Sequence, residues 1–152
     1  MSREALKESV EDKFVSLIRD KLHTFPDSFE FPPAVYKMMQ GEILNFDADK
    51  GIFANRFPVL REQLNPFGNM QGGMIAAVID NTVGPLSILV APASFTRYMD
   101  LKYRKAIPLD VDFIYVTARF VEQKKRQIFF TTTVCSEEGE EFASAKSTHW
   151  MI

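Results

Sequence analysis

Apolar residues recur at helical spacing in the first part of the chain. The positions Leu6, Val10, Phe14, Leu17, Ile18 and Leu22 are separated by charged residues, which is the pattern of an amphipathic surface helix. Phe25 precedes Pro26, and a residue before proline disfavours the helical conformation, so we expect this helix to end near His23. Residues 24–33 are then predicted to form an ordered connector, and residues 34–40 a short helix.

The middle of the chain holds an almost wholly apolar segment, residues 74–90. It is too uniformly apolar for a surface helix and predicts a buried one, with a kink or a break at Gly84 and Pro85. Two strand candidates precede it, residues 42–46 and 51–60, and the turn-like sequence DADKG between them predicts a hairpin.

Alternation with a period of two dominates the last third of the chain. Residues 99–104 alternate apolar and charged side chains, and strands are also predicted over 111–121, 128–135 and about 142–151. The resulting prediction is an α+β fold, in which a curved antiparallel sheet of five or six strands surrounds one apolar helix. An added N-terminal helix and Pro-rich connector, residues 1–41, would pack on residues 42–152 to give one globular domain.

Composition narrows the classes of protein and partner. A length of 152 residues suits one domain, and 46% hydrophobic residues exclude general disorder. A net charge of -2 gives no overall attraction to nucleic acid. Cys135 is the single cysteine, so neither a disulfide nor a cysteine-based zinc site is expected, and we expect a cytoplasmic protein without a membrane anchor. His23 and His149 lack metal-ligand spacing and are predicted to be ordinary surface or strand residues.

Asp80 is the one ionisable residue between Gly72 and Pro92, inside the apolar segment. Aspartate is a poor residue for a helix interior, and a buried carboxylate without a partner is costly. Two interpretations follow from its position. Asp80 is either a buried residue satisfied by a neighbouring amide or by a backbone group across a dimer interface, or a carboxylate at the wall of a pocket that acts as nucleophile or general base.

Gly72 and Gly73 stand at the start of the same predicted helix, where the first N–H groups have no intrahelical partner. These groups can stabilise an oxyanion, although a tight turn with close packing explains two glycines equally well. Asp80 lies roughly 12 Å along the helix axis from Gly72. Two antiparallel copies of the helix bring Asp80 of one chain to Gly72 of another, so we predict a homodimer or a larger assembly.

These residues resemble the hotdog-fold acyl-CoA thioesterases, in particular the branch similar to the phenylacetic-acid-pathway thioesterase. That family shows an Asn, then a His-Gly-Gly at a helix start, then an acidic residue. Here Asn65, the sequence Gln71-Gly72-Gly73 and Asp80 stand at the same spacings. The segment TRYMDLKYRKAIP, which begins at Thr96, is similar to a later family segment. The resemblance covers most of the chain from about residue 42.

The resemblance implies hydrolysis of an acyl-CoA thioester at the interface of a dimer, which is often paired into a tetramer. Asp80 would attack the thioester or activate water, the Gly72 amide would polarise the carbonyl, and Asn65 would position water or substrate. Thr96 would support Asp80 or water from the facing subunit. Gln71 departs from the family, because glutamine donates a hydrogen bond but cannot titrate. No cofactor is implied beyond the CoA of the substrate.

Other residues have two interpretations each. Arg104 and Lys105 can meet the phosphates of CoA, as can Arg97 and Lys102, or can belong to a charged outer strand face. The aromatic residues Phe25, Phe29, Phe31 and Phe67, with Gly73 beside the helix start, can line an acyl pocket. Alternatively, the three phenylalanines of the connector hold the N-terminal helix on the sheet.

Two further functions fit the same scaffold. One is a non-catalytic protein that binds an acyl thioester or a lipid, in which Asp80 holds structure or water. The other is a dehydratase, which is disfavoured because the helix region carries no pair of His and acidic residue.

Overall fold

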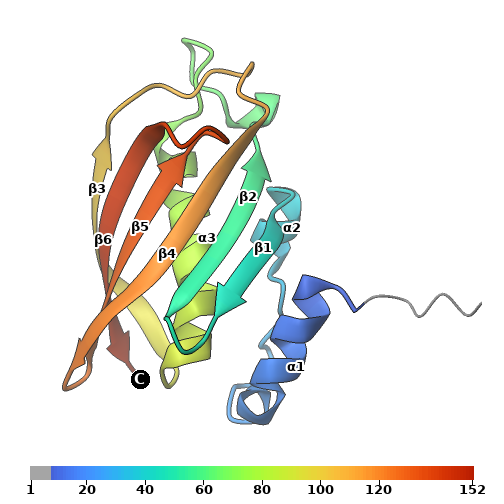
Figure 1. Ribbon diagram of the computed structural model, residues 1–152, viewed down its shortest axis with the longest axis vertical. Coiled ribbons are helices and arrows are strands. Elements are labelled where there is room, and N and C mark those ends of the chain that lie inside the picture. Colours follow the sequence, from blue (N-terminus) through green and yellow to red (C-terminus); the bar gives the residue numbers. More distant parts are fainter. Residues whose placement is uncertain (1–7) are drawn as a thin grey trace, which may run out of the picture.

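The structure is a computed structural model that describes residues 8–152 (Figure 1). Leu6, predicted to begin the first helix, lies outside the described residues. The elements in chain order are α1 (Val10–Leu22), α2 (Ala34–Met38), β1 (Glu42–Asp47), β2 (Ile52–Pro58), the short 3-10 helix η1 (Arg61–Gln63), α3 (Gly72–Val90), β3 (Ser94–Tyr103), β4 (Phe113–Lys124), β5 (Gln127–Cys135) and β6 (Glu141–Met151).

The six strands form one antiparallel sheet in the order β1-β2-β4-β5-β6-β3. The sheet curves around α3, which lies against its inner face, as Figure 1 shows. The predicted α+β architecture is therefore confirmed, with six strands, one central helix and a helix added at the N-terminal side. In the described residues β3 pairs only with β6, so it forms one edge of the sheet. It directly follows α3 in the chain.

The N-terminal helix α1 is anchored to this core by its apolar stripe. Ser9 and Asp12 form a capping box that satisfies free N–H groups at the helix start. Phe14 and Ile18 are buried, and the Phe14 ring lies 5.2 Å from that of Phe53 in β2. Aromatic contacts of this kind hold α1 beside β1, at the edge of the sheet opposite β3 (Figure 1).

The central helix α3 continues through Pro85, so the predicted break at Gly84 and Pro85 is wrong. Proline lacks the N–H that would bond the carbonyl four residues earlier, which is that of Asn81. Nδ2 of the buried Asn55 lies 3.4 Å from this carbonyl oxygen and donates to it. Nδ2 of Asn55 also donates to Thr82, and Asn55 accepts from the Tyr36 hydroxyl, so it is held in place on three sides. A side chain from the sheet thus replaces the missing backbone donor.

Helix α3 is long and apolar enough to cross a membrane by length and composition. In this structure, however, its residues Val78, Ile79, Val83 and Leu86 are completely buried. They pack on β2 and β4, which together provide the largest part of the surface that α3 contacts. Helix α3 is therefore the core helix of the fold.

Candidate active site

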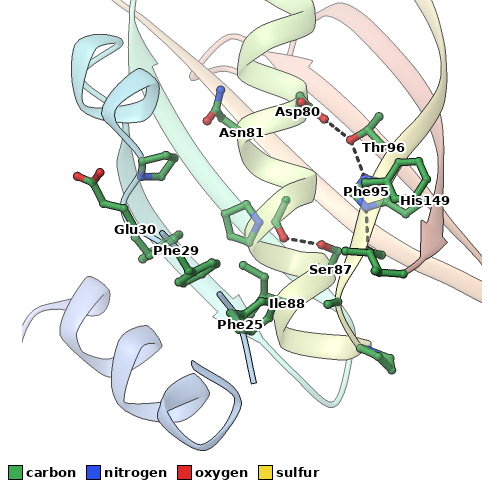
Figure 2. Close-up of a pocket in the computed structure, with 18 of the residues that line it drawn as sticks. Phe25, Phe29, Glu30, Asp80, Asn81, Ser87, Ile88, Phe95, Thr96 and His149 are labelled. Carbon is green, nitrogen blue, oxygen red and sulfur yellow. Dashed lines mark hydrogen bonds between the residues drawn. The ribbon is translucent and has the colours of Figure 1, made fainter. Parts of the chain in front are cut away.

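Asp80 lies on the side of α3 that is turned away from β2 and β4, beside the first residues of β3 (Figure 2). It is exposed in the single chain, so the interpretation as a buried, sealed carboxylate does not hold within one chain. It does line a cavity, as the functional interpretation expected.

Four side chains form a continuous hydrogen-bonded series that begins at Asp80 (Figure 2). Thr96 Oγ1 donates to Asp80 Oδ1 over 2.7 Å. The same oxygen lies 3.1 Å from Nε2 of His149, and Nδ1 of His149 lies 3.2 Å from Oγ of Ser94. Thr96 thus contacts Asp80 within one chain, whereas the resemblance implied support for Asp80 or water from a facing subunit.

The series has a defined direction of hydrogen bonding. A threonine hydroxyl carries one hydrogen, and in Thr96 this hydrogen is given to Asp80. The contact with His149 must therefore be donated by Nε2–H of the imidazole. In the neutral ring that burial favours, Nδ1 is then the unprotonated nitrogen, and it accepts from the Ser94 hydroxyl. Each donor in the series points toward the carboxylate.

A β-bulge brings Thr96 and His149 together. Thr96 is paired with His149 and Tyr98 with Thr148, so Arg97 is the extra residue of β3. The bulge changes the alternation of the strand, and Thr96 therefore faces α3 on the same side of the sheet as Met99. Directly opposite residues on one face of an antiparallel pair lie close enough for their side chains to bond. The pairing of Thr96 with His149 has this geometry.

His149 is a functional candidate that sequence reasoning assigned to an ordinary strand or surface position. It is 2% exposed, and burial lowers the pKa of its imidazole, although the Asp80 charge opposes this shift. The ring is therefore neutral at neutral pH, which leaves Nδ1 free to accept from the Ser94 hydroxyl. Alternation along β6 places His149 on the face of the buried Ala145 and Ser147, and this was the available signal for a buried histidine.

The cavity beside Asp80 has a volume of about 560 Å³. It lies between the outer side of α3, the connector 24–33 and the start of β3, and Asp80, Thr96 and His149 all line it (Figure 2). The three aromatic residues of the connector, Phe25, Phe29 and Phe31, line it as well. Phe31 also packs on Phe14 of α1, with ring centroids 4.9 Å apart, so it both lines the cavity and holds the helix.

The glycine end of α3 is a separate region. Gln71 precedes the helix, is exposed and provides no side-chain cap. The N–H groups of Gly72 and Gly73 belong to the first turn and have no intrahelical acceptor. The Tyr103 hydroxyl donates to the Gly72 carbonyl oxygen over 2.8 Å, and a Cβ on Gly72 would lie 3.1 Å from this hydroxyl. A Cβ on Gly73 would meet no atom within 4 Å, so this glycine faces open space.

Asn65 shapes the loop before this helix. Its Oδ1 accepts from the backbone N–H groups of Phe67 and Asn69, at 2.9 and 3.2 Å. Phe67 at the tip of the loop is 89% exposed. None of the residues Asn65, Phe67, Gln71, Gly72 and Gly73 lines the cavity beside Asp80. The structure therefore brings Asp80 and Thr96 together and leaves the other predicted site residues at the start of the helix.

Arg104 and Lys105 carry partners of their own. Arg104 Nε lies 3.3 Å from Glu141 Oε1, and Lys105 pairs with Glu140. All four side chains are at least one-third exposed to solvent. A phosphate at this position would compete with two carboxylates, so the structure gives more weight to the interpretation of these residues as a charged outer face.

No group of three or more His, Cys, Asp and Glu side chains is placed to hold a metal ion within residues 8–152. The chemistry available at the site is therefore that of a carboxylate held by a hydroxyl, a neutral imidazole and a second hydroxyl beside an apolar cavity. Oδ1 of Asp80 is engaged by Thr96, while Oδ2 has no hydrogen-bond partner in the described part of the chain.

Comparison with known proteins identifies the fold. No protein-family model and no curated protein matches the chain. The PaaI protein from the phenylacetic acid degradation operon of E. coli is 14% identical, with a TM-score of 0.75 over 95% of this chain and 96% of that one. A hypothetical thioesterase from Streptococcus pneumoniae, solved with coenzyme A, is 22% identical, with a TM-score of 0.68 over 74% of this chain and 85% of that one.

A protein from Streptococcus mutans bound to acetyl-CoA is 21% identical, with a TM-score of 0.70 over 84% of this chain and 95% of that one. The structural neighbours are thus PaaI-like hotdog thioesterases, and some of them are solved with CoA or acetyl-CoA. The chain has the hotdog fold, as the resemblance of its motifs implied.

Proposed function

We propose that the protein hydrolyses acyl-CoA thioesters and that Asp80 is the general base of the reaction. The observation that carries this proposal is the placement of Asp80 at the wall of an apolar cavity, with one carboxylate oxygen fixed by Thr96 and the other without a partner among residues 8–152. A carboxylate in this position can take a proton from a water molecule while its orientation stays fixed. The fold, shared with thioesterases solved with CoA ligands, supports the same reaction class.

The reaction follows from this geometry. Asp80 Oδ2 accepts a proton from water as the water oxygen bonds to the thioester carbonyl carbon. Backbone N–H groups stabilise the oxyanion of the tetrahedral intermediate. When the C–S bond breaks, the proton on Asp80 passes to the leaving sulfur, which gives the free acid and CoA. Asp80 returns to its ionised form, and Thr96 again donates to Oδ1.

The oxyanion donors are proposed to come from a second copy of the chain. Gly72 lies about 12 Å along α3 from Asp80, too far for both groups of one chain to reach a single carbonyl. The edge strand β3 has an outer side without a neighbouring strand in the described chain, and it exposes Phe95 and Tyr98, which is 62% exposed. Long edge strands with exposed aromatic residues favour association. We propose a dimer in which Gly72 of one chain meets Asp80 of the other.

The test is release of free thiol from a panel of acyl-CoA esters by the wild-type protein and by Asp80→Asn. The amide cannot accept the proton, so kcat/KM is expected to fall by about a thousandfold or more. Asp49→Asn, an exposed residue in the turn between β1 and β2, makes the same chemical change away from the site and is expected to keep wild-type activity.

Equal activity of Asp80→Asn and wild type would overturn the role of Asp80. If the wild type cleaves none of the esters but binds several of them in calorimetric titrations, the protein is an acyl-thioester binder instead of an enzyme. Circular dichroism of both variants establishes that any loss of activity is not a loss of fold.

A further inference from the structure

The cavity continues from Asp80 along one stripe of α3. Asp80, Gly84 and Ile88 are spaced four residues apart, so they lie on the same side of the helix, and all three line the cavity. A group bound with its carbonyl carbon near Asp80 would therefore extend over Gly84 toward Ile88. The lining beyond the carboxylate is mainly apolar.

Gly84, between Asp80 and Ile88 on this side of α3, has no side chain to cover the helix backbone. A Cβ built on Gly84 would meet no heavy atom within 4 Å, although the residue lies in the middle of the longest helix. Glycine in a helix interior lowers helix stability relative to alanine. Within residues 8–152 no packing contact explains the glycine, and its φ lies outside the left-handed region, so backbone conformation does not explain it either. The missing side chain instead enlarges the cavity.

The opposite wall is aromatic and comes from the connector. The rings of Phe25 and Phe29 are stacked with centroids 4.6 Å apart, and both line the cavity across from the outer side of α3 (Figure 2). Phe31 and Tyr36, and Phe95 at the start of β3, add further aromatic side chains to the lining. Such a lining buries apolar groups and offers few hydrogen bonds to polar ones.

The charges of the lining side chains disfavour acyl groups that end in a second carboxylate. Glu30 and Asp80 are the ionisable side chains that carry charge at neutral pH, and both are negative. Burial keeps His149 neutral by lowering its pKa, so the lining side chains present no cation. An acyl group that ends in a second carboxylate would meet repulsion from Glu30, which the exposed Lys37 offsets only in part. Lys21 lies outside the lining, and its Nζ donates to the carbonyl oxygen of Ile88.

We propose that this cavity takes the uncharged, apolar acyl group of the thioester and that Gly84 determines how large this group can be. The inference rests on the proposed function, since it places the thioester carbonyl at Asp80. Gly84 lies about 6 Å along the helix axis from Asp80. With C–C bonds of about 1.5 Å, an acetyl group ends well before Gly84, whereas an octanoyl group passes it.

Substitution of Gly84 tests the proposal. Gly84→Ala and Gly84→Val add one and three carbons to the cavity, and both are assayed for kcat/KM on acetyl-CoA and octanoyl-CoA. Hydrolysis of octanoyl-CoA is expected to fall about tenfold in Gly84→Ala and further in Gly84→Val. Hydrolysis of acetyl-CoA, which ends before Gly84, is expected to stay within about twofold of wild type. Alanine favours the helix, so the Tm of Gly84→Ala should not decrease.

A charge variant tests the second part of the inference. Glu30→Lys places a cation at the cavity wall, and the ratio of activity on glutaryl-CoA to activity on octanoyl-CoA should increase about tenfold or more. Glu137→Lys makes the same change in the turn between β5 and β6, outside this cavity, and should leave the ratio unchanged. Glu30 is exposed and pairs only with the exposed Lys37, at 3.4 Å, so the substitution should have little effect on stability.

The results separate the inference from the proposed function. If Gly84→Ala and Gly84→Val change both substrates by the same factor, or neither, the role of Gly84 is overturned while hydrolysis stands. If the wild type hydrolyses no ester, the proposed function fails, and the cavity is then tested by calorimetric titration with octanoyl-CoA. In that case, weaker binding by Gly84→Val than by wild type supports the cavity as the acyl site, and equal binding overturns it.

Discussion

Helix α3 has two polar regions, one at Asp80 in its middle and one at Gly72 and Gly73 at its start, and a single chain surrounds them differently. At the middle of the helix, Asp80 is fixed by Thr96 and His149 and opens on a cavity. At the helix start, Gly72 and Gly73 offer N–H groups without intrahelical acceptors, yet neither lines that cavity. One region has a reactive group and room for a ligand, and the other has donors that face open space.

This difference follows from the length of a rigid helix. Because residues 72–80 belong to one uninterrupted stretch of α3, the helix keeps Gly72 and Asp80 at a fixed separation that no side-chain movement can close. In the proposed function, a single chain therefore supplies two halves of a site that a second chain completes. We infer that pairing of two chains brings Asp80 of one chain to the Gly72 N–H of the other.

After Asp80→Asn, the largest effect is expected from removing the N–H at the glycine end. Gly72 is the first residue of α3, a position where proline is well tolerated, and Gln71 before it has the extended conformation that proline requires. Gly72→Pro should keep the helix but lower kcat about a hundredfold, as the loss of an oxyanion donor does. Gly72→Ala is the matched control, because its Cβ also approaches Tyr103 while the N–H is retained.

Mixed assemblies then show whether donor and carboxylate come from different chains. When equal amounts of Asp80→Asn and Gly72→Pro chains are co-assembled, about half of the dimers contain one chain of each kind. If the site spans the interface, each mixed dimer has one intact site, and about a quarter of wild-type activity should return. If both groups act within one chain, every site in the mixture is defective and no activity returns.

The overall architecture could be predicted from the sequence because it depends on local patterns. Alternating residues in the last third of the chain and the uniformly apolar segment 74–90 predicted the sheet and its central helix. The error at Pro85 has a long-range cause, since the side chain that bonds the free carbonyl of Asn81 comes from Asn55 in β2. A contact between residues this far apart in the chain cannot be predicted from the sequence pattern around Pro85.

The candidate site could be predicted only in part. Asp80 is conspicuous as a lone charge in an apolar segment, and Thr96 was identified through the resemblance of its segment. The contact between Thr96 and His149 depends on the bulge at Arg97, which reverses the alternation of β3. If the alternation of residues 99–104 is extended backward without a bulge, Thr96 falls on the outer face. His149 therefore had no visible partner in the sequence.

A smaller effect is expected from Thr96, which positions Asp80. Thr96→Val preserves the shape of the side chain but removes the hydroxyl that holds Asp80 Oδ1. The carboxylate then loses its fixed orientation, and kcat should fall about tenfold, with a smaller change in KM. Thr96→Ser keeps the hydroxyl and is expected to retain most of the activity. Loss of activity in Thr96→Ser together with retained activity in Thr96→Val would indicate that the methyl group, and not the hydrogen bond, is what matters.

The smallest predicted effect concerns the pH dependence of stability, which reports the state of His149. Burial lowers the pKa of this imidazole below its ordinary value of 6.5. Below about pH 6.5 the unfolded chain therefore binds a proton that the folded chain does not, so the free energy of unfolding falls as the pH decreases. Above this range both states are neutral at His149, and its contribution is constant.

The matched variant is His149→Gln, because glutamine can donate to Thr96 and accept from Ser94 but does not titrate. Thermal unfolding of both proteins is followed between about pH 5 and pH 8. The Tm of the wild type should fall toward the acidic end by on the order of a few degrees more than that of His149→Gln. If the two curves are parallel, His149 does not change protonation on unfolding. Burial then does not keep the imidazole neutral, and the inferred donation from Ser94 to Nδ1 loses its basis.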